Sequence, residues 1–201
     1  YLENDSLMIA WNRYLAEILV KKLNEKGVNI SIINNDRKNF DLIIGIGLGN
    51  RELYQYSPDL KVDFQCIYVP GAFKYADMKE KLQRLSFFNL LISNDLDVSI
   101  KIAEKIQSKI LIKTHLPAVS RQLKGPNILE SDCIKTDIDG IYCRNIMNIS
   151  QFNCPSVYIT AYTVRDFNDY KSWILPKKGF SNCEVFATAI SEALSEYFSA
   201  N

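Results

Sequence analysis

The sequence predicts a single α/β domain over residues 1–201, a three-layer unit in which a mostly parallel sheet has helices on both faces. Helix-like and strand-like hydrophobic patterns alternate along the chain, as they do in βαβ units. The 201 residues, 47% of them hydrophobic, are enough to form one core. No internal repeat or Pro/Ser-rich linker divides the chain, so we interpret residues 51–120 as an elaborated middle segment of the same domain.

The charge balance limits the kinds of partner. There are 24 Lys and Arg residues against 23 Asp and Glu residues, a net charge of +1. The chain therefore lacks the excess positive charge with which proteins bind nucleic acid or anionic membranes. No apolar run approaches the roughly 18 residues that a membrane-spanning helix needs. We expect neither nucleic-acid binding nor membrane insertion.

The histidine and cysteine content limits metal chemistry. A single histidine, His115, excludes a metal site built from several imidazoles. The five cysteines are odd in number, and no two are spaced as Cys-x-x-Cys. We interpret them as buried free thiols rather than as a disulfide framework or a zinc knuckle. The sequence predicts no metal ion and no other cofactor.

The first third of the chain predicts a long helix followed by two strands. Apolar residues recur every three or four positions from Leu7 to Leu23, and Gly27 is placed to end the helix. Residues 28–33 have a strand pattern, and the apolar run 41–46 is typical of a strand buried on both faces.

The middle third alternates between strand and helix patterns. We expect, in order, a strand over 64–69, a helix over 75–85, a strand over 87–92, a helix capped by Asp97, and a short strand over 110–112. Residues 120–139 are polar and show no period, which predicts a long loop.

The last third predicts two more strands, over 140–144 and 156–162, and a C-terminal helix. Ser181 and Glu184 have the spacing of a capping box, in which the hydroxyl and the carboxylate each accept a bond from a free backbone N–H. The apolar face of this helix consists of Phe186, Ala189, Ile190, Ala193, Leu194 and Tyr197.

Candidate site residues follow the predicted strands, because open α/β sheets bind ligands beyond the carboxyl ends of their strands. The segment Gly45-Ile46-Gly47-Leu48-Gly49-Asn50 would let backbone amides approach a ligand. Its spacing is not that of a dinucleotide-binding loop, and close packing is the favoured interpretation of these glycines.

Two other strand ends carry polar residues. His115 would need a nucleophile or an orienting carboxylate to act as a base, so a structural or surface role is favoured. The cluster Arg165, Asp166, Asn168 and Asp169 follows the strand over 156–162, although polar loops at such places are usually just solvated. Several aromatic residues near loops would stack on a sugar or a base, but packing is again favoured: Tyr54, Tyr56, Tyr68, Phe73 and Tyr75.

Four segments share features with one enzyme family. They are the first helix with Glu3 and Ile9-Ala10, the strand from Asp41 to Asn50, the helix over 100–106, and the closing strand and helix over 154–160 and 187–198. Together they resemble the zinc-dependent N-acetylmuramoyl-L-alanine amidases of bacterial cell walls. The resemblance covers about half of the chain in pieces.

The resemblance implies a zinc ion held by two histidines and a glutamate, with a further glutamate as the catalytic base. Glu3 matches the glutamate ligand, whereas the strand that carries the first histidine would precede Tyr1. Gly47 stands at the position of the second histidine and Thr160 at that of the catalytic glutamate. Glycine has no side chain and a neutral hydroxyl is a poor base, so the resemblance implies a relative without zinc and without catalytic residues.

We therefore expect a non-catalytic, amidase-like domain that binds a cell-wall glycan or peptide, or a protein partner, at the strand ends. The expected binding residues are Gly45, Gly47, Gly49, Asn50, Thr160 and Arg165. This function would place the protein in the cell envelope.

Two alternatives stay open. The strand Asp41-Leu42-Ile43-Ile44-Gly45, the turn Val69-Pro70-Gly71 and the segment Asn89-Leu90-Leu91-Ile92-Ser93 also resemble the nucleotide- or acceptor-binding half of two-domain glycosyltransferases, which implies a nucleotide-sugar and a cytoplasmic location. A third possibility is a protein-interaction module. The strand order separates the first two, because only the amidase resemblance predicts that strands 41–46 and 156–159 are neighbours, with Gly47 facing Thr160.

Overall fold

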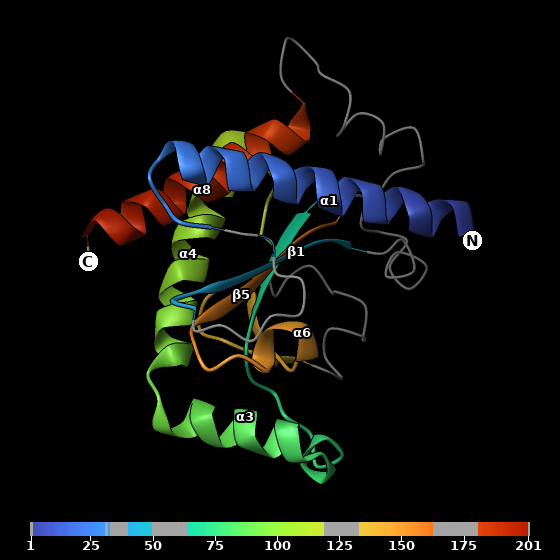
Figure 1. The fold of residues 1–201 in the computed structure, drawn as a ribbon, viewed down its shortest axis with the longest axis vertical. Helices are drawn as coiled ribbons and strands as arrows, with labels where there is room; N and C mark the ends of the chain where they lie inside the picture. Colours follow the sequence, from blue (N-terminus) through green and yellow to red (C-terminus); the bar gives the residue numbers. More distant parts are fainter. Residues whose placement is uncertain are drawn as a thin grey trace.

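A five-stranded sheet with helices packed around it organises the chain (Figure 1). The computed structural model describes residues 2–30, 32, 40–49, 64–118, 133–162 and 181–200. The elements are α1 (Leu2–Glu25), β1 (Ile43–Gly49), β2 (Phe64–Val69), the 3-10 helix η1 (Asp77–Lys79), α3 (Lys81–Ile92), α4 (Asp95–Thr114), β3 (Cys133–Lys135), β4 (Ile141–Arg144), α6 (Met147–Ser150), β5 (Ser156–Tyr162) and α8 (Asn182–Ala200).

The strand order is β1-β5-β2-β4-β3. The pairs β1–β5 and β2–β4 are parallel, whereas β2–β5 and β3–β4 are antiparallel. The predicted α/β class is confirmed, and the sheet is mixed where the sequence predicted mostly parallel pairing. A hydrophobic pattern shows which residues form a strand, but it contains no information on the direction of the neighbouring strand.

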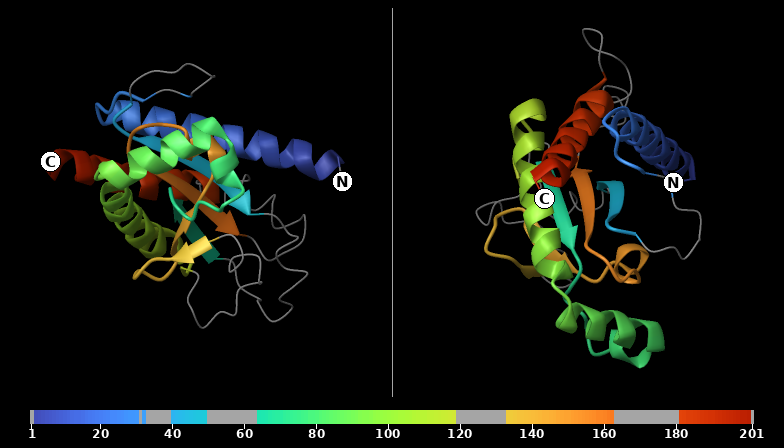
Figure 2. Two further views of the ribbon diagram at one scale, coloured as in Figure 1. Left: turned by 90° about the horizontal axis from the view of Figure 1, so that it is seen from below. Right: turned by 60° about the vertical axis from the view of Figure 1, so that its left-hand side comes forward.

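One face of the sheet packs against α1, α4 and α8, which lie along the same side of it (Figure 2). Alternate residues of the central strands, such as Ile67 and Ile159, point into this layer because side chains on a strand alternate between faces. The helices contribute apolar residues at intervals of three and four: Leu15, Leu19 and Leu23 from α1, Ile102, Ile106 and Ile110 from α4, and Phe186, Ile190 and Leu194 from α8.

The other face of the sheet is covered in part by the short helix α6. Ile149 of α6 packs with Ile43 and Cys154 in a second, smaller apolar cluster. Phe40, Phe152 and Tyr158 surround this cluster, with the first two rings in edge-to-face contact. Helices therefore lie on both faces of the sheet, as predicted.

The predicted start of α8 and the predicted end of α1 are confirmed, whereas Asp97, predicted as a helix cap, lies in the first turn of α4, whose N-cap is Asn94. The Glu184 backbone N–H donates to Ser181 Oγ at 3.2 Å, and the Ser181 N–H donates to Glu184 Oε2 at 2.7 Å, so the capping box is formed at the start of α8. Gly27 ends α1 with a φ of 78°, a left-handed conformation that glycine adopts without steric cost.

Several predicted elements are wrong. The expected strands over 87–92 and 110–112 lie inside α3 and α4, because short apolar runs do not distinguish a strand from a helix. The expected helix over 75–85 is instead η1 and the first turns of α3, and residues 28–30 form no strand. Residues 133–135, expected in a loop, pair with β4 as β3. None of the helices in the described ranges is both long and apolar enough to cross a membrane.

Candidate functional site

Residues from β1, β5, β2 and β4 share the sheet face opposite α1, α4 and α8. Gly45 pairs with Tyr158 and Gly47 with Thr160, and on the other side of β5, Cys66 pairs with Thr160. Residues paired across neighbouring strands point to the same face of a sheet. We call this surface the tyrosine face and define it by Gly45, Gly47, Cys66, Tyr68, Tyr142, Arg144, Tyr158 and Thr160.

The two glycines of the tyrosine face make room for the side chain of Tyr158. A Cβ atom at Gly45 would overlap Cδ2 of the Tyr158 ring, and a Cβ atom at Gly47 would overlap its Oη. The Tyr158 side chain therefore lies over the backbone of β1 and brings its hydroxyl next to Gly47. Close packing, the favoured interpretation of these glycines, is present here, and a contact between them and a ligand stays a prediction.

Three tyrosines form a row across the strands. The ring centroids of Tyr158 and Tyr68 are 6.4 Å apart, and those of Tyr68 and Tyr142 are 6.5 Å apart. The guanidinium carbon of Arg144 lies 5.3 Å from the centroid of the Tyr68 ring, within the range of a cation–π interaction. Tyr68 and Tyr142 are buried, whereas Tyr158 is half-buried. The row therefore leaves Tyr158 as its accessible member.

Burial raises the pKa of the Tyr158 hydroxyl above its ordinary value, and the nearby charge of Arg144 acts in the opposite direction. Burial also raises the pKa of the Cys66 thiol, which is completely enclosed. Both groups are protonated at neutral pH. The tyrosine face thus presents a neutral phenol beside β1. The thiol of Cys66, the residue that pairs with Thr160 on β2, is unreactive.

Thr160 is the polar residue at the centre of this face. Its side chain is 3% exposed, and Oγ1 finds no hydrogen-bond partner within the described part of the chain. A buried hydroxyl without a partner costs about 1–3 kcal/mol, so such groups are uncommon in folded proteins unless a bound molecule satisfies them.

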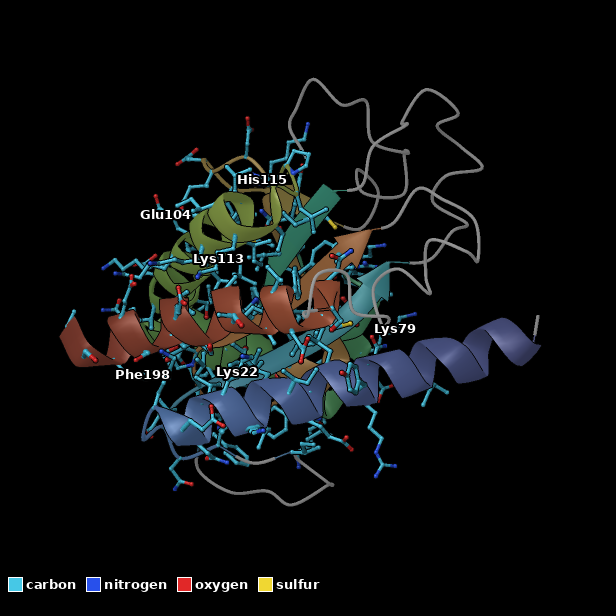
Figure 3. All side chains as sticks on the ribbon, turned by 90° about the horizontal axis from the view of Figure 1, so that it is seen from above. Lys22, Lys79, Glu104, Lys113, His115 and Phe198 are labelled. Atoms are coloured by element: carbon cyan, nitrogen blue, oxygen red, sulfur yellow. The ribbon has the colours of Figure 1, made fainter. Side chains whose placement is uncertain are left out.

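The other predicted site residues are not brought together with this surface. His115 is exposed and ends α4, where its backbone N–H donates to the Leu111 carbonyl at 3.0 Å and its φ is 58° (Figure 3). This is a structural position, in agreement with the favoured interpretation. Gly49 pairs with Tyr162 through its backbone. Asn50, Arg165 and the cluster of residues 166–169 lie outside the described residues.

The residues at this site do not fit a zinc ion. Across the described ranges, no three His, Cys, Asp or Glu side chains are placed to hold a metal. Gly47 and Thr160 supply neither a ligand nor a strong base, and the Tyr158 hydroxyl occupies the space where a side chain at position 47 would lie. Glu3 lies in α1, and its side chain is outside the described part.

Most of the tyrosine row is absent from the predicted site residues. Tyr158, Tyr142 and Arg144 are not among them, and for Tyr68 packing is favoured over stacking on a sugar or a base. The alternation in β5 contains a usable signal, since Tyr158 and Thr160 are two residues apart and must share a face. The partners on β2 and β4 were not predictable in this way, because they depend on the strand order.

Comparisons with known proteins support the fold. No protein-family model matches the chain, and no curated protein matches its sequence. Among solved structures, the chain is similar to the CwlD amidase from Clostridioides difficile, determined in complex with the GerS lipoprotein. The TM-score is 0.50 at 11% sequence identity, over 93% of this chain and 84% of that chain. The chain has an amidase-like fold.

The strand order agrees with this likeness. β1 and β5 are neighbours, and Gly47 pairs with Thr160, as the amidase resemblance predicted. The glycosyltransferase alternative required strands over 87–92 and 110–112, which are helical, and its sheet would be parallel rather than mixed. The topology does not support that alternative.

Proposed function

We propose that this amidase-like chain binds a cell-wall glycan or peptide at the carboxyl ends of β1 and β5 and does not hydrolyse it. The observation that carries the proposal is the buried Oγ1 of Thr160, which has no hydrogen-bond partner among the described residues. A ligand that bonds to this hydroxyl would remove the cost of leaving it unpaired.

The position of Thr160 supports a ligand-binding role. β1 and β5 are parallel, so their carboxyl ends lie at the same edge of the sheet, where α/β proteins bind ligands. Thr160 lies near that end of β5, and the Tyr158 hydroxyl reaches Gly47 beside it. Two neutral hydroxyls that donate and accept hydrogen bonds suit the hydroxyl and amide groups of a glycan or peptide.

The same residues support binding without hydrolysis. No member of the tyrosine face, as defined from the described strands, carries a carboxylate or an imidazole that would act as a base near neutral pH. The raised pKa of Cys66 keeps its thiol protonated, and a protonated thiol is a poor nucleophile. The proposed role is therefore recognition of the cell-wall polymer.

Replacement of Thr160 tests the proposal. Thr160→Val removes the hydroxyl and keeps the shape of the side chain, so we expect at least about tenfold weaker co-sedimentation with purified peptidoglycan, which corresponds to about 1.4 kcal/mol. The melting temperature should stay the same or rise, because the lost hydroxyl makes no bond in the described structure. Weaker binding together with unchanged or higher stability separates a ligand role from a structural one.

Thr188→Val is the matched control. The Thr188 hydroxyl donates to the Glu184 carbonyl within α8, on the helical side of the protein. This variant should bind peptidoglycan as the wild type does. Three results would contradict the proposal: no co-sedimentation of the wild type, stoichiometric zinc in elemental analysis, or release of peptides from peptidoglycan. A thermal shift with a nucleotide-sugar would instead favour the glycosyltransferase alternative.

A protein partner is the second candidate. The solved CwlD amidase is in complex with a lipoprotein, and this chain has an exposed apolar surface on α3. Partner binding through α3 should be insensitive to Thr160→Val and sensitive to a charge placed on α3, such as Ile92→Glu. Glycan or peptide binding should show the opposite sensitivity.

A further inference from the structure

The strand β1 lies at the border of the sheet, where one side pairs with β5 and the other side has no partner in the described part of the chain (Figure 2). The Ile43 N–H points toward β5 and donates to the Pro155 carbonyl at 3.0 Å. Because main-chain groups alternate in direction along a strand, those of Ile44 and Ile46 point to the other side. A row of main-chain donors and acceptors therefore faces away from the sheet.

A groove of about 1630 Å³ lies along the start of β1. Apolar residues from both layers that flank the sheet contribute to its lining. They come from four places: Leu19 and Leu23 of α1, residues 28–30, residues 40–46, and Ile149 of α6. The open side of β1 thus borders a space with apolar groups above and below the plane of the sheet.

Residues 28–30 line the same groove and have a strand pattern without forming a strand. Val28 and Ile30 pack against the main apolar cluster, and so do Ile44 and Ile46 of β1. In both segments, residues two positions apart point to the same layer, which is the periodicity of a strand. No main-chain hydrogen bond between described residues joins the two segments. Two strand-like segments therefore border one groove without pairing.

The open side of β1 favours an extended peptide as the occupant of this groove. A second extended chain presents donors and acceptors at the spacing of β1, whereas a helix bonds its own main chain and a lipid tail has no such groups. The groove also exceeds the roughly 300–1,000 Å³ of a small-molecule pocket. A second copy of this chain fits poorly, because its strands are paired in its own sheet and its helices would collide with α1.

We propose that β1 binds a strand donated by another polypeptide, which extends the sheet at this side. The donated strand bonds to the main-chain groups of Ile44 and Ile46 and lies between β1 and residues 28–30. Residues 42–46 span about 16 Å at roughly 3.3 Å per residue, so the groove holds about five residues of the partner. Because apolar residues line the groove on both sides of the sheet plane, the donated strand is apolar on both faces.

Hydrogen exchange measured for each amide by NMR tests whether this side of β1 is open. In the free chain, the amides of Ile44 and Ile46 should exchange at least about tenfold faster than those of Ile43 and Gly45, which face β5. Slow exchange at Ile44 and Ile46 in the free chain would overturn the proposal. If that protection grew with protein concentration, a second copy would fill the groove, and otherwise the chain would fill it itself.

The probe for binding is the synthetic peptide Lys-Val-Ile-Val-Ile-Val-Lys, whose central residues favour strands. It should slow exchange at Ile44 and Ile46 by at least about tenfold and leave Ile43 and Gly45 unchanged. Two N-methylated forms, each modified at one set of alternate residues, keep the side chains and lose the donors along one side. In fluorescence anisotropy, at least one form should bind more than about tenfold more weakly than the parent peptide. Equal affinity of all three, or no saturable binding of the parent up to about 1 mM, would contradict the proposal.

Replacement of Ile44 tests the same contact from the protein side. Ile44→Pro removes the outward N–H and should weaken peptide binding more than about tenfold, and proline is tolerated where a strand N–H faces away from the sheet. Ile44→Ala is the matched control, because it shortens the side chain and keeps the N–H, and it should bind within about threefold of the wild type. Equal affinity of the two variants would overturn the proposal.

Two further measurements keep this test independent of folding and of the peptidoglycan proposal. Equal melting temperatures would show that Ile44→Pro folds as Ile44→Ala does, and the N-methylated peptides test the unmodified protein if it does not. Thr160→Val should leave binding of the synthetic peptide unchanged, because Thr160 lies on β5 and not at the open side of β1. Loss of peptide binding in Thr160→Val would contradict a separate site.

Discussion

The helices α3 and α8 are both rich in apolar residues, yet they use them in opposite ways. α8 packs against α4 and α1 and buries Phe186, Ile190 and Leu194 completely or almost completely. α3 leaves Phe88 and Ile92 more than half exposed. The comparison shows that apolar periodicity predicts a helix with a contact surface, but it does not predict whether that surface meets the same chain or another molecule.

Different interactions fix the two helices in position. α8 begins with a capping box and is stabilised by its position between α1 and α4. α3 is fixed by polar bonds, from Asn145 to Gln83 and from Arg84 Nη1 to the carbonyls of Met78 and Lys79. We expect α8 to belong to the cooperative core and α3 to open at lower free energy.

The largest expected difference concerns the two phenylalanines. Phe186→Ala should lower the free energy of unfolding by about 3–5 kcal/mol, because it leaves a cavity in the core. Phe88→Ala should change it by about 0.5 kcal/mol or less, since the ring is 58% exposed. Urea denaturation of the two variants measures the contrast. Equal losses would show that α3 contributes to the core as α8 does.

Loss of the Asn145 side chain should release α3 selectively. Asn145→Ala leaves Gln83 and Asp77 without their shared donor and the Ser150 hydroxyl of α6 without its acceptor, which together should cost about 1–3 kcal/mol. Hydrogen exchange should become faster in α3 and stay unchanged in α8. Asn153→Ala is the control, because its contact with Asn89 is exposed and should matter little. A uniform increase in exchange across both helices would contradict a separate anchoring of α3.

The smallest expected difference concerns the helix starts. Ser181→Ala removes the hydroxyl that accepts the Glu184 N–H and should cost about 1 kcal/mol. Glu80→Ala at the start of α3 should have little effect, because the Glu80 side chain makes no capping bond within the described residues. Thermal denaturation of the two variants gives the comparison. A larger loss for Glu80→Ala would show that α3 depends on a cap.

Parts of the fold were predictable because the signals are local. The capping box of Ser181 and Glu184 involves residues three positions apart, and Gly27 ends α1 through its own backbone conformation. The strand over 156–162 was predicted with its observed bounds. In contrast, the apolar runs 87–92 and 110–112 predict strands where the structure has helices, since short apolar runs fit either a strand or a buried helix and the choice depends on neighbours distant in the chain.

The candidate site was predictable in part for the same reason. The family resemblance placed Gly47 opposite Thr160, and the two residues are paired in the sheet. The row of Tyr158, Tyr68 and Tyr142 was not predictable, because β2 and β4 join β5 only through the strand order. The binding roles of Gly45, Gly47 and Thr160 stay predictions.

The sequence by itself determined the α/β class, the capped C-terminal helix and the residue types at positions 47 and 160, because these depend on local patterns and side-chain chemistry. Only the tertiary structure decided that β5 lies between β1 and β2, that Tyr158 covers the two glycines, and that large apolar residues of α3 face outward. These features arise from contacts between distant segments. Such contacts are chosen by packing and hydrogen bonding across the whole domain, which no short window of sequence contains.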